Sequence, residues 1–136
     1  MKEVYLYFRT QATIGNDDAS DDSCMFPLSH LQGMVPSADD TLNIYFKPMI
    51  KQAMNRFDHD GDSTSTVNSD YVVVTLSSNN THKDVIADLS ALFAAVGSTK
   101  EGFISVADDL TSTYAVNGIA GLSTISIQAA VATAGA

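Results

Sequence analysis

The sequence predicts an α+β protein: a mainly antiparallel sheet of about five or six strands, with one long amphipathic helix packed on one face. Three observations favour this class. Several short segments alternate apolar and polar residues, as strands with a buried face do. Residues 81–96 instead repeat apolar residues at three- and four-residue spacing, which is typical of a helix. Charged residues make up only 17% of the chain, and few of them are the Lys and Glu that suit exposed helix faces.

The clearest strand is the segment VYLYFRT, residues 4–10. Its apolar side chains Val4, Leu6 and Phe8 would share one face, while Tyr5 and Tyr7 would lie on the other. Similar reasoning predicts four further strands, over residues 41–48, 70–77, 101–109 and about 124–128.

The predicted helix begins after Thr81, which together with Asp84 forms a variant capping box, and Gly97 is placed to end it. Because the helix lies between strands 70–77 and 101–109, a right-handed βαβ crossover is an alternative that would make the sheet mixed. Two segments are less regular. Residues 24–36 are apolar but interrupted by Pro and Gly, so we expect an irregular or short-strand segment, and residues 49–57 fit either helix or loop.

Composition limits the function. A chain of 136 residues is expected to form one domain, residues 1–136. Its 16 acids against 7 bases give a net charge of -9, and no cluster of Lys and Arg is present, which argues against nucleic acids and anionic membranes as partners. The N-terminal residues lack the plan of a signal peptide, and Cys24 is the only cysteine, so we expect synthesis in a cytoplasm without disulfides.

The segment FDHDGDS, residues 57–63, resembles the beginning of a calcium-binding loop. Asp58, Asp60 and Asp62 provide oxygen ligands at alternate positions, but Gly61 comes too early and Ser69 stands where a chelating Glu is needed. The segment after the loop is also predicted as strand rather than helix. We therefore expect only weak, adventitious metal binding at these three aspartates.

Paired aspartates recur at residues 17–18, 21–22, 39–40 and 108–109. They stand at strand ends and loop starts, where Asp bonds the local backbone, so a structural use is favoured. The alternative is a metal-dependent or small-molecule enzyme that uses these pairs, with Asp108 and Asp109 the first to inspect. His30, His59 and His82 lie far apart in the sequence, and none has a partner at metal-ligand spacing except His59 among its own aspartates, so we expect no catalytic residues and no cofactor. His82 is expected to face solvent, and Cys24 to be buried.

The strands are apolar or aromatic on both faces, yet only one long helix is available to cover a sheet. We therefore expect the protein to associate with itself in a closed oligomer, with three or more copies favoured over two. Tyr5, Tyr7 and Tyr45 are the candidate contact residues. In the alternative interpretation, these tyrosines cover the far side of a two-sided core.

The segments VYLYFRTQATIGNDDASDDSCMFPLSHLQGM, LNIYFKPM and GFISVADD resemble small proteins encoded by tailed phages of marine bacteria, especially cyanophages. The resemblance extends over most of the chain but includes no catalytic signature. It implies a non-enzymatic structural or assembly accessory protein, made in the host cytoplasm and associated with the virion, so that other virion proteins join the expected partners. A small regulatory binding module is a further alternative.

Overall fold

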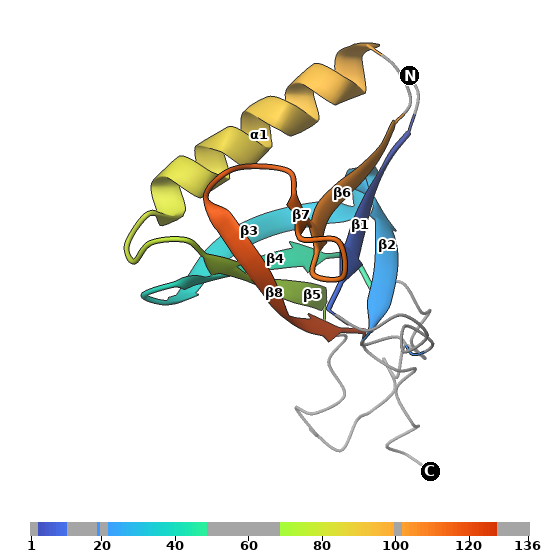
Figure 1. Ribbon diagram of the computed structural model, residues 1–136. Helices are drawn as coiled ribbons and strands as arrows, with labels where there is room; N and C mark the ends of the chain where they lie inside the picture. Colours follow the sequence, from blue (N-terminus) through green and yellow to red (C-terminus); the bar gives the residue numbers. More distant parts are fainter. Residues whose placement is uncertain (1–2, 11–18, 20–21, 49–68, 100–101, 128–136) are drawn as a thin grey trace, which may run out of the picture.

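The computed structural model contains two β-sheets and one α-helix (Figure 1), and it describes residues 3–10, 19, 22–48, 69–99 and 102–127. In this part of the chain the elements are β1 (Val4–Arg9), β2 (Ser23–Pro27), the 3-10 helix η1 (Leu28–His30), β3 (Leu31–Ala38), β4 (Thr41–Phe46), β5 (Asp70–Leu76), α1 (His82–Thr99), β6 (Gly102–Asp108), β7 (Thr113–Tyr114) and β8 (Ile119–Ser126).

The strands form two four-stranded sheets. Sheet A has the order β2-β1-β6-β7, and sheet B has the order β3-β4-β5-β8. Strands β1 and β6 are parallel, and every other pairing among the described strands is antiparallel. The predicted α+β class and mainly antiparallel pairing are confirmed. The prediction of a single sheet of five or six strands is wrong, because strands with the same inward alternation divide between two facing layers.

The change of sheet takes place within residues 24–36, the segment predicted to be irregular or short strand. Strand β2 ends at Pro27, η1 turns the chain, and β3 begins in the other sheet. The backbone N–H of Lys47 donates to the carbonyl of His30 at 2.9 Å, which fixes this corner to the end of β4. The Pro and Gly residues that interrupt the apolar pattern therefore accompany a corner between two strands.

Helix α1 connects the two sheets. It follows β5 of sheet B and precedes β6 of sheet A, so a βαβ crossover within one sheet does not form. Sheet A is nevertheless mixed, because β6 runs parallel to β1.

The core lies between the inner faces of the sheets. Three phenylalanines join them: Phe26 of sheet A stacks on Phe46 of sheet B with ring centroids 4.1 Å apart, and Phe8 meets both rings edge-on. Helix α1 adds Val85, Leu89 and Phe93, which are buried at the spacing that the sequence predicts. Each such side chain stabilises the fold by about 1.5–3 kcal/mol relative to exposure.

Helix α1 begins at His82, directly after Thr81 as predicted, but it ends later than predicted. The Thr81 hydroxyl donates to the carbonyl of Ser78 at 2.8 Å, while the first helical bond joins the Val85 N–H to the Thr81 carbonyl. The helix continues through Gly97 to Thr99, since a glycine costs a helix only about 1 kcal/mol relative to alanine. Among the described residues, no helix has both the length and the apolar character needed to cross a membrane.

Candidate functional site

The outer face of sheet A carries a group of apolar side chains. Strand β1 directs Val4, Leu6 and Phe8 into the core, so its alternate residues Tyr5 and Tyr7 point outward. Neighbouring strands add Met25 from β2 and Phe103 from β6. Tyr5 is 38% exposed, Met25 41% and Phe103 61%. We call Tyr5, Tyr7, Met25 and Phe103 together the aromatic face.

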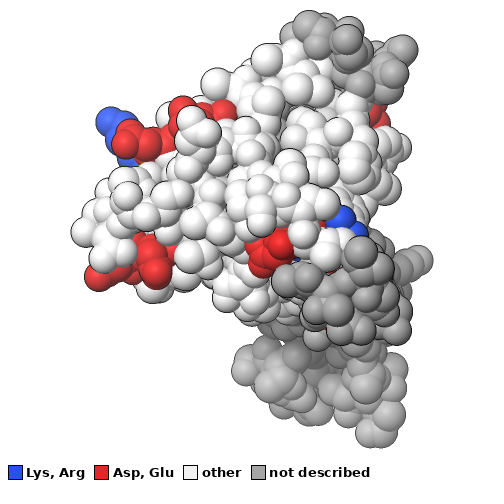
Figure 2. Space-filling model, viewed as in Figure 1, with Lys and Arg blue, Asp and Glu red and all other residues white. Residues whose placement is uncertain are grey.

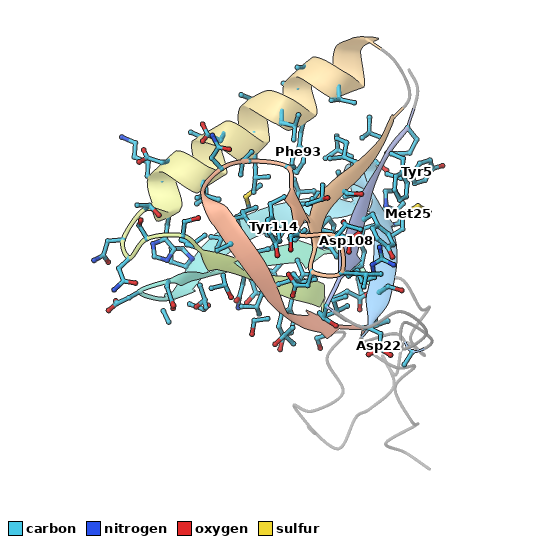
Figure 3. All side chains as sticks on the ribbon, viewed as in Figure 1. Tyr5, Asp22, Met25, Phe93, Asp108 and Tyr114 are labelled. Atoms are coloured by element: carbon cyan, nitrogen blue, oxygen red, sulfur yellow. The ribbon has the colours of Figure 1, made fainter. Side chains whose placement is uncertain are left out.

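The aromatic face is continuous across three adjacent strands. Tyr5 lies opposite Phe103 in the β1–β6 pairing, and Tyr7 lies opposite Met25 in the β1–β2 pairing. The rings of Tyr7 and Phe103 are also in contact, with centroids 5.3 Å apart and planes tilted by 34°. Figure 3 shows Tyr5 and Met25 at the margin of the molecule, on the side away from α1.

An ion pair borders the aromatic face. The guanidinium of Arg9 donates to both carboxylate oxygens of Asp108, at 2.7 Å from Nε and 2.6 Å from a terminal nitrogen, and it lies 5.7 Å from the ring centroid of Tyr7. The side chains of Arg9 and Asp108 are only 17% and 6% exposed. Hydrogen bonding from Arg9 holds the pKa of Asp108 below its ordinary value, although desolvation opposes this. This edge of the face is therefore charged but internally balanced.

Other acidic side chains lie at a different end of the molecule. Asp39 and Asp40 are in the exposed β3–β4 turn, and Asp84 and Asp88 are on the exposed side of α1. Figure 2 shows acidic side chains gathered near the start of α1, on the left of the view, with large uncharged areas beside them. A second protein approaching sheet A therefore avoids these four carboxylates.

The structure separates the three tyrosines predicted as contact residues. Tyr5 and Tyr7 share the aromatic face, whereas Tyr45 lies in β4 of sheet B, where its ring packs on Tyr71 with centroids 5.6 Å apart. The Tyr45 hydroxyl accepts a 3.1 Å bond from Nδ2 of Asn43. Sequence analysis missed Phe103 and Met25. Phe103 had a signal, since it alternates with Ile104 in the strand pattern, while Met25 stood in the segment interrupted by Pro27.

The aspartates proposed as metal ligands receive no support from the described residues. Asp58, Asp60 and Asp62 lie outside the part of the chain that the structure describes. Ser69, the twelfth position of that motif, donates its hydroxyl to Oε1 of Gln32 at 2.5 Å. Within the described ranges, no three His, Cys, Asp or Glu side chains are grouped as a metal site requires.

Asp108 and Asp109, the pair selected for inspection, have structural partners. Asp108 binds Arg9 and also accepts the backbone N–H of Leu110 at 3.1 Å. Asp109 accepts the Tyr114 hydroxyl at 2.7 Å and the backbone N–H of Leu122 at 3.2 Å. Both carboxylates thus stabilise the turn after β6 and its contact with β8.

Cys24 and His82 were predicted to be buried and exposed, respectively. Cys24 is partly buried against the core, and burial, followed by the nearby charge of Asp70, raises the pKa of its thiol to about 12, so the reactive thiolate is disfavoured. The prediction that His82 faces solvent is wrong, because His82 is half-buried. Its Nε2 lies 2.8 Å from the carbonyl oxygen of Ala38 and 3.0 Å from that of Thr41, so this nitrogen donates and joins the start of α1 to the β3–β4 hairpin.

Comparison with known proteins adds no relative: no protein-family model matches the chain, and no curated protein or solved structure matches it.

Proposed function

We propose that the chain is a non-enzymatic structural or assembly protein of phage type that associates with copies of itself through the aromatic face of sheet A. The observation that carries the proposal is the exposure of Tyr5, Met25 and Phe103, large side chains contributed by three adjacent strands. Contiguous apolar groups of this kind mark interaction surfaces more often than isolated exposed residues do.

Burial of this face would provide the driving force for association. Removing apolar surface from water contributes roughly 25 cal/mol per Å². Aromatic residues and methionine are also enriched at protein interfaces relative to the rest of the surface. The Arg9–Asp108 pair at the border is already satisfied within one copy, so a partner need not supply a countercharge.

The net charge of -9 opposes self-association, and salt should therefore strengthen it. At marine ionic strength the Debye length falls to roughly 4 Å, which weakens repulsion between the acidic ends of neighbouring copies. We propose a closed oligomer of three or more copies, since one sheet face offers too little area for a stable pair.

Light scattering after size exclusion, at low and high salt, tests the proposal. The double variant Tyr5→Ser/Phe103→Ser should have a lower mass than the wild type at equal concentration. Val35→Ser is the matched control, because Val35 is 51% exposed but belongs to β3 of sheet B, and its mass should be unchanged. A monodisperse wild-type monomer at about 100 µM in high salt would overturn the proposal.

The phage-type part of the proposal depends on the resemblance of the three sequence segments. It predicts that purified virions of a phage encoding this chain contain the protein. The rival enzyme reading has no observation in its favour among the described residues, because Asp108 and Asp109 are both bound by neighbouring groups.

A further inference from the structure

We infer that strand β2 pairs through its free edge with β2 of a second copy, antiparallel, about a two-fold axis at Met25. The inference rests on the proposed self-association and specifies the contact that begins it. Among the described strands, β2 pairs with β1 alone and so forms one edge of sheet A.

The hydrogen bonds of β1 and β2 show which backbone groups point to this edge. The N–H of Thr10 donates to the carbonyl of Asp22 at 2.8 Å, so the backbone of residue 22 faces β1 in this register, although the Asp22 N–H itself donates to the carbonyl of Ala19 at 3.0 Å. Alternation along the unshifted register then directs the backbone of Cys24 and Phe26 toward β1. Met25, between them, directs its N–H and its carbonyl outward.

The edges of sheet B are poor templates for another strand. Strand β3 contains Pro36, which lacks an N–H, and its pairing with β4 shifts register twice. The register of β8 with β5 also shifts twice, and Asp109 already accepts the N–H of Leu122 in β8. Bulges, proline and covering side chains are the features by which proteins prevent edge pairing.

In sheet A the opposite edge is also obstructed. Strand β7 has only two residues, Thr113 and Tyr114, and pairs with the end of β6. A Cβ at Gly102 would be 2.8 Å from Cγ1 of Val96, so α1 lies against the face of β6 at its start, next to this edge. Among the described strands, β2 is therefore the edge with a regular register and no covering contact at its centre.

The sequence of β2 suits two-fold pairing. Met25 is the middle residue of Ser23–Pro27, so an axis at Met25 places the two Met25 residues opposite each other, where they exchange N–H···O bonds. Ser23 then lies opposite Pro27 of the second copy. Pro27 has no N–H but can accept through its carbonyl, and within the described part of the chain the Ser23 N–H makes a long, 3.4 Å bond to the carbonyl of Ala19.

Edge pairing would also explain how a small face supports a larger assembly. Three strands of this length present on the order of 300 Å² on one side, whereas a stable interface needs about 800 Å² per partner. Joining two β2 edges continues sheet A across the axis and places two aromatic faces side by side. Stacking of such doubled faces gives an assembly of four copies, within the range proposed above.

Hydrogen exchange of the wild type tests the edge directly. In the assembled protein at high salt, NMR should find the Met25 amide exchanging at least tenfold more slowly than at low salt, where the copies separate. Assembly with an equally fast Met25 amide would overturn the edge pairing but leave the self-associating function intact. A wild type that stays monomeric would overturn both.

Two substitutions at one position provide a second test. Met25→Pro removes the outward N–H without removing a bond to β1. Proline is tolerated at such a position, because the missing N–H faces away from the sheet. Its concentration for half-assembly should rise at least tenfold. Met25→Ala keeps the N–H and should raise that concentration much less. Equal effects of the two substitutions, in variants with wild-type circular dichroism, would overturn the edge pairing.

Discussion

The hydroxyl of Tyr114 donates a 2.7 Å hydrogen bond to Oδ1 of Asp109, and the same carboxylate accepts the backbone N–H of Leu122. Tyr114 belongs to sheet A and Leu122 to sheet B, so one carboxylate joins the two sheets. Tyr114 is labelled in Figure 3, where its label stands beside the ribbon of β8. This contact is polar, whereas Phe8, Phe26 and Phe46 join the two sheets through apolar rings.

Tyr114→Phe should therefore lower the free energy of unfolding by about 1 kcal/mol at neutral pH, the usual worth of one hydrogen bond. The substitution should also change how the free energy of unfolding depends on pH in the alkaline range. Burial, followed by the bond to Asp109, raises the pKa of Tyr114 to about 12. Because the folded pKa is above the unfolded value of roughly 10, this contribution is complete below pH 10 and is lost as the pH rises toward 12.

Urea unfolding from pH 8 to 12 measures this effect. The difference between wild type and Tyr114→Phe should shrink across the window from about pH 10 to 12. Tyr5→Phe is the control, since Tyr5 is on the outer face, and it should match the wild type throughout. A constant difference between wild type and Tyr114→Phe would contradict the role assigned to the bond with Asp109.

Arg9→Met should leave the carboxylate of Asp108 buried without its cation, at a cost of about 3 kcal/mol at neutral pH. The effect of protonating Asp108 on the free energy of unfolding should change sign between the wild type and the variant. In the wild type the lowered pKa of Asp108 means that its contribution is present above roughly pH 4 and is lost as the pH falls through the folded pKa. In the variant, desolvation acts without Arg9, so protonation should relieve the cost.

The measurement is unfolding free energy from pH 7 to 3, with Lys83→Met as the control because Lys83 is an exposed cation on α1. The gap between Arg9→Met and wild type should narrow as the pH falls, while Lys83→Met should track the wild type. If the gap stays constant with pH, Arg9 contributes mainly through packing on Tyr7.

Sequence periodicity predicted the helix and the inward face of β1, because these depend on neighbours within one element. The division into two sheets depends on which strands pair, and the inward alternation of Leu6 and Ile44 is the same in either arrangement. Strand β2 was obscured by Pro27, which marks the corner after the strand. Met25 and Phe103 come to lie beside Tyr7 and Tyr5 only through strand pairings between residues that are distant in the sequence.

The candidate site shows the same limit. Alternation placed Tyr5 and Tyr7 on one outward face, but no local pattern shows that Tyr45 belongs to the other sheet. His82 likewise looked exposed in the first turn of a helix, because its acceptors, the carbonyls of Ala38 and Thr41, are about forty residues away in the chain.

Leu89→Asp should unfold the protein or lower its stability by several kcal/mol, because Leu89 is fully buried and its replacement would bring an unpaired charge into the core. Asp88→Asn, at the exposed neighbouring position, should be nearly neutral. Thermal unfolding followed by circular dichroism compares the two. Equal midpoints would mean that α1 does not pack on the sheets through this face.

Gly118→Ala tests how closely α1 approaches the chain before β8. A Cβ at residue 118 would lie 2.5 Å from Cγ2 of Val85, a short side chain held in the core, so the structure must shift to accept it. We expect a loss of about 1–3 kcal/mol. Gly33→Ala is the control, because a Cβ there meets nothing within 4 Å, and it should be neutral or slightly stabilising.

A double-mutant cycle makes the Gly118 prediction specific. Val85→Ala removes the atom that the new methyl group would strike, so Gly118→Ala should cost much less in the Val85→Ala background than in the wild type. Because Val85→Ala itself creates a cavity, the informative quantity is the difference between the two Gly118→Ala costs, measured by chemical denaturation. An interaction energy near zero would show that Val85 and Gly118 are not in contact and that α1 sits farther from the β7–β8 connection.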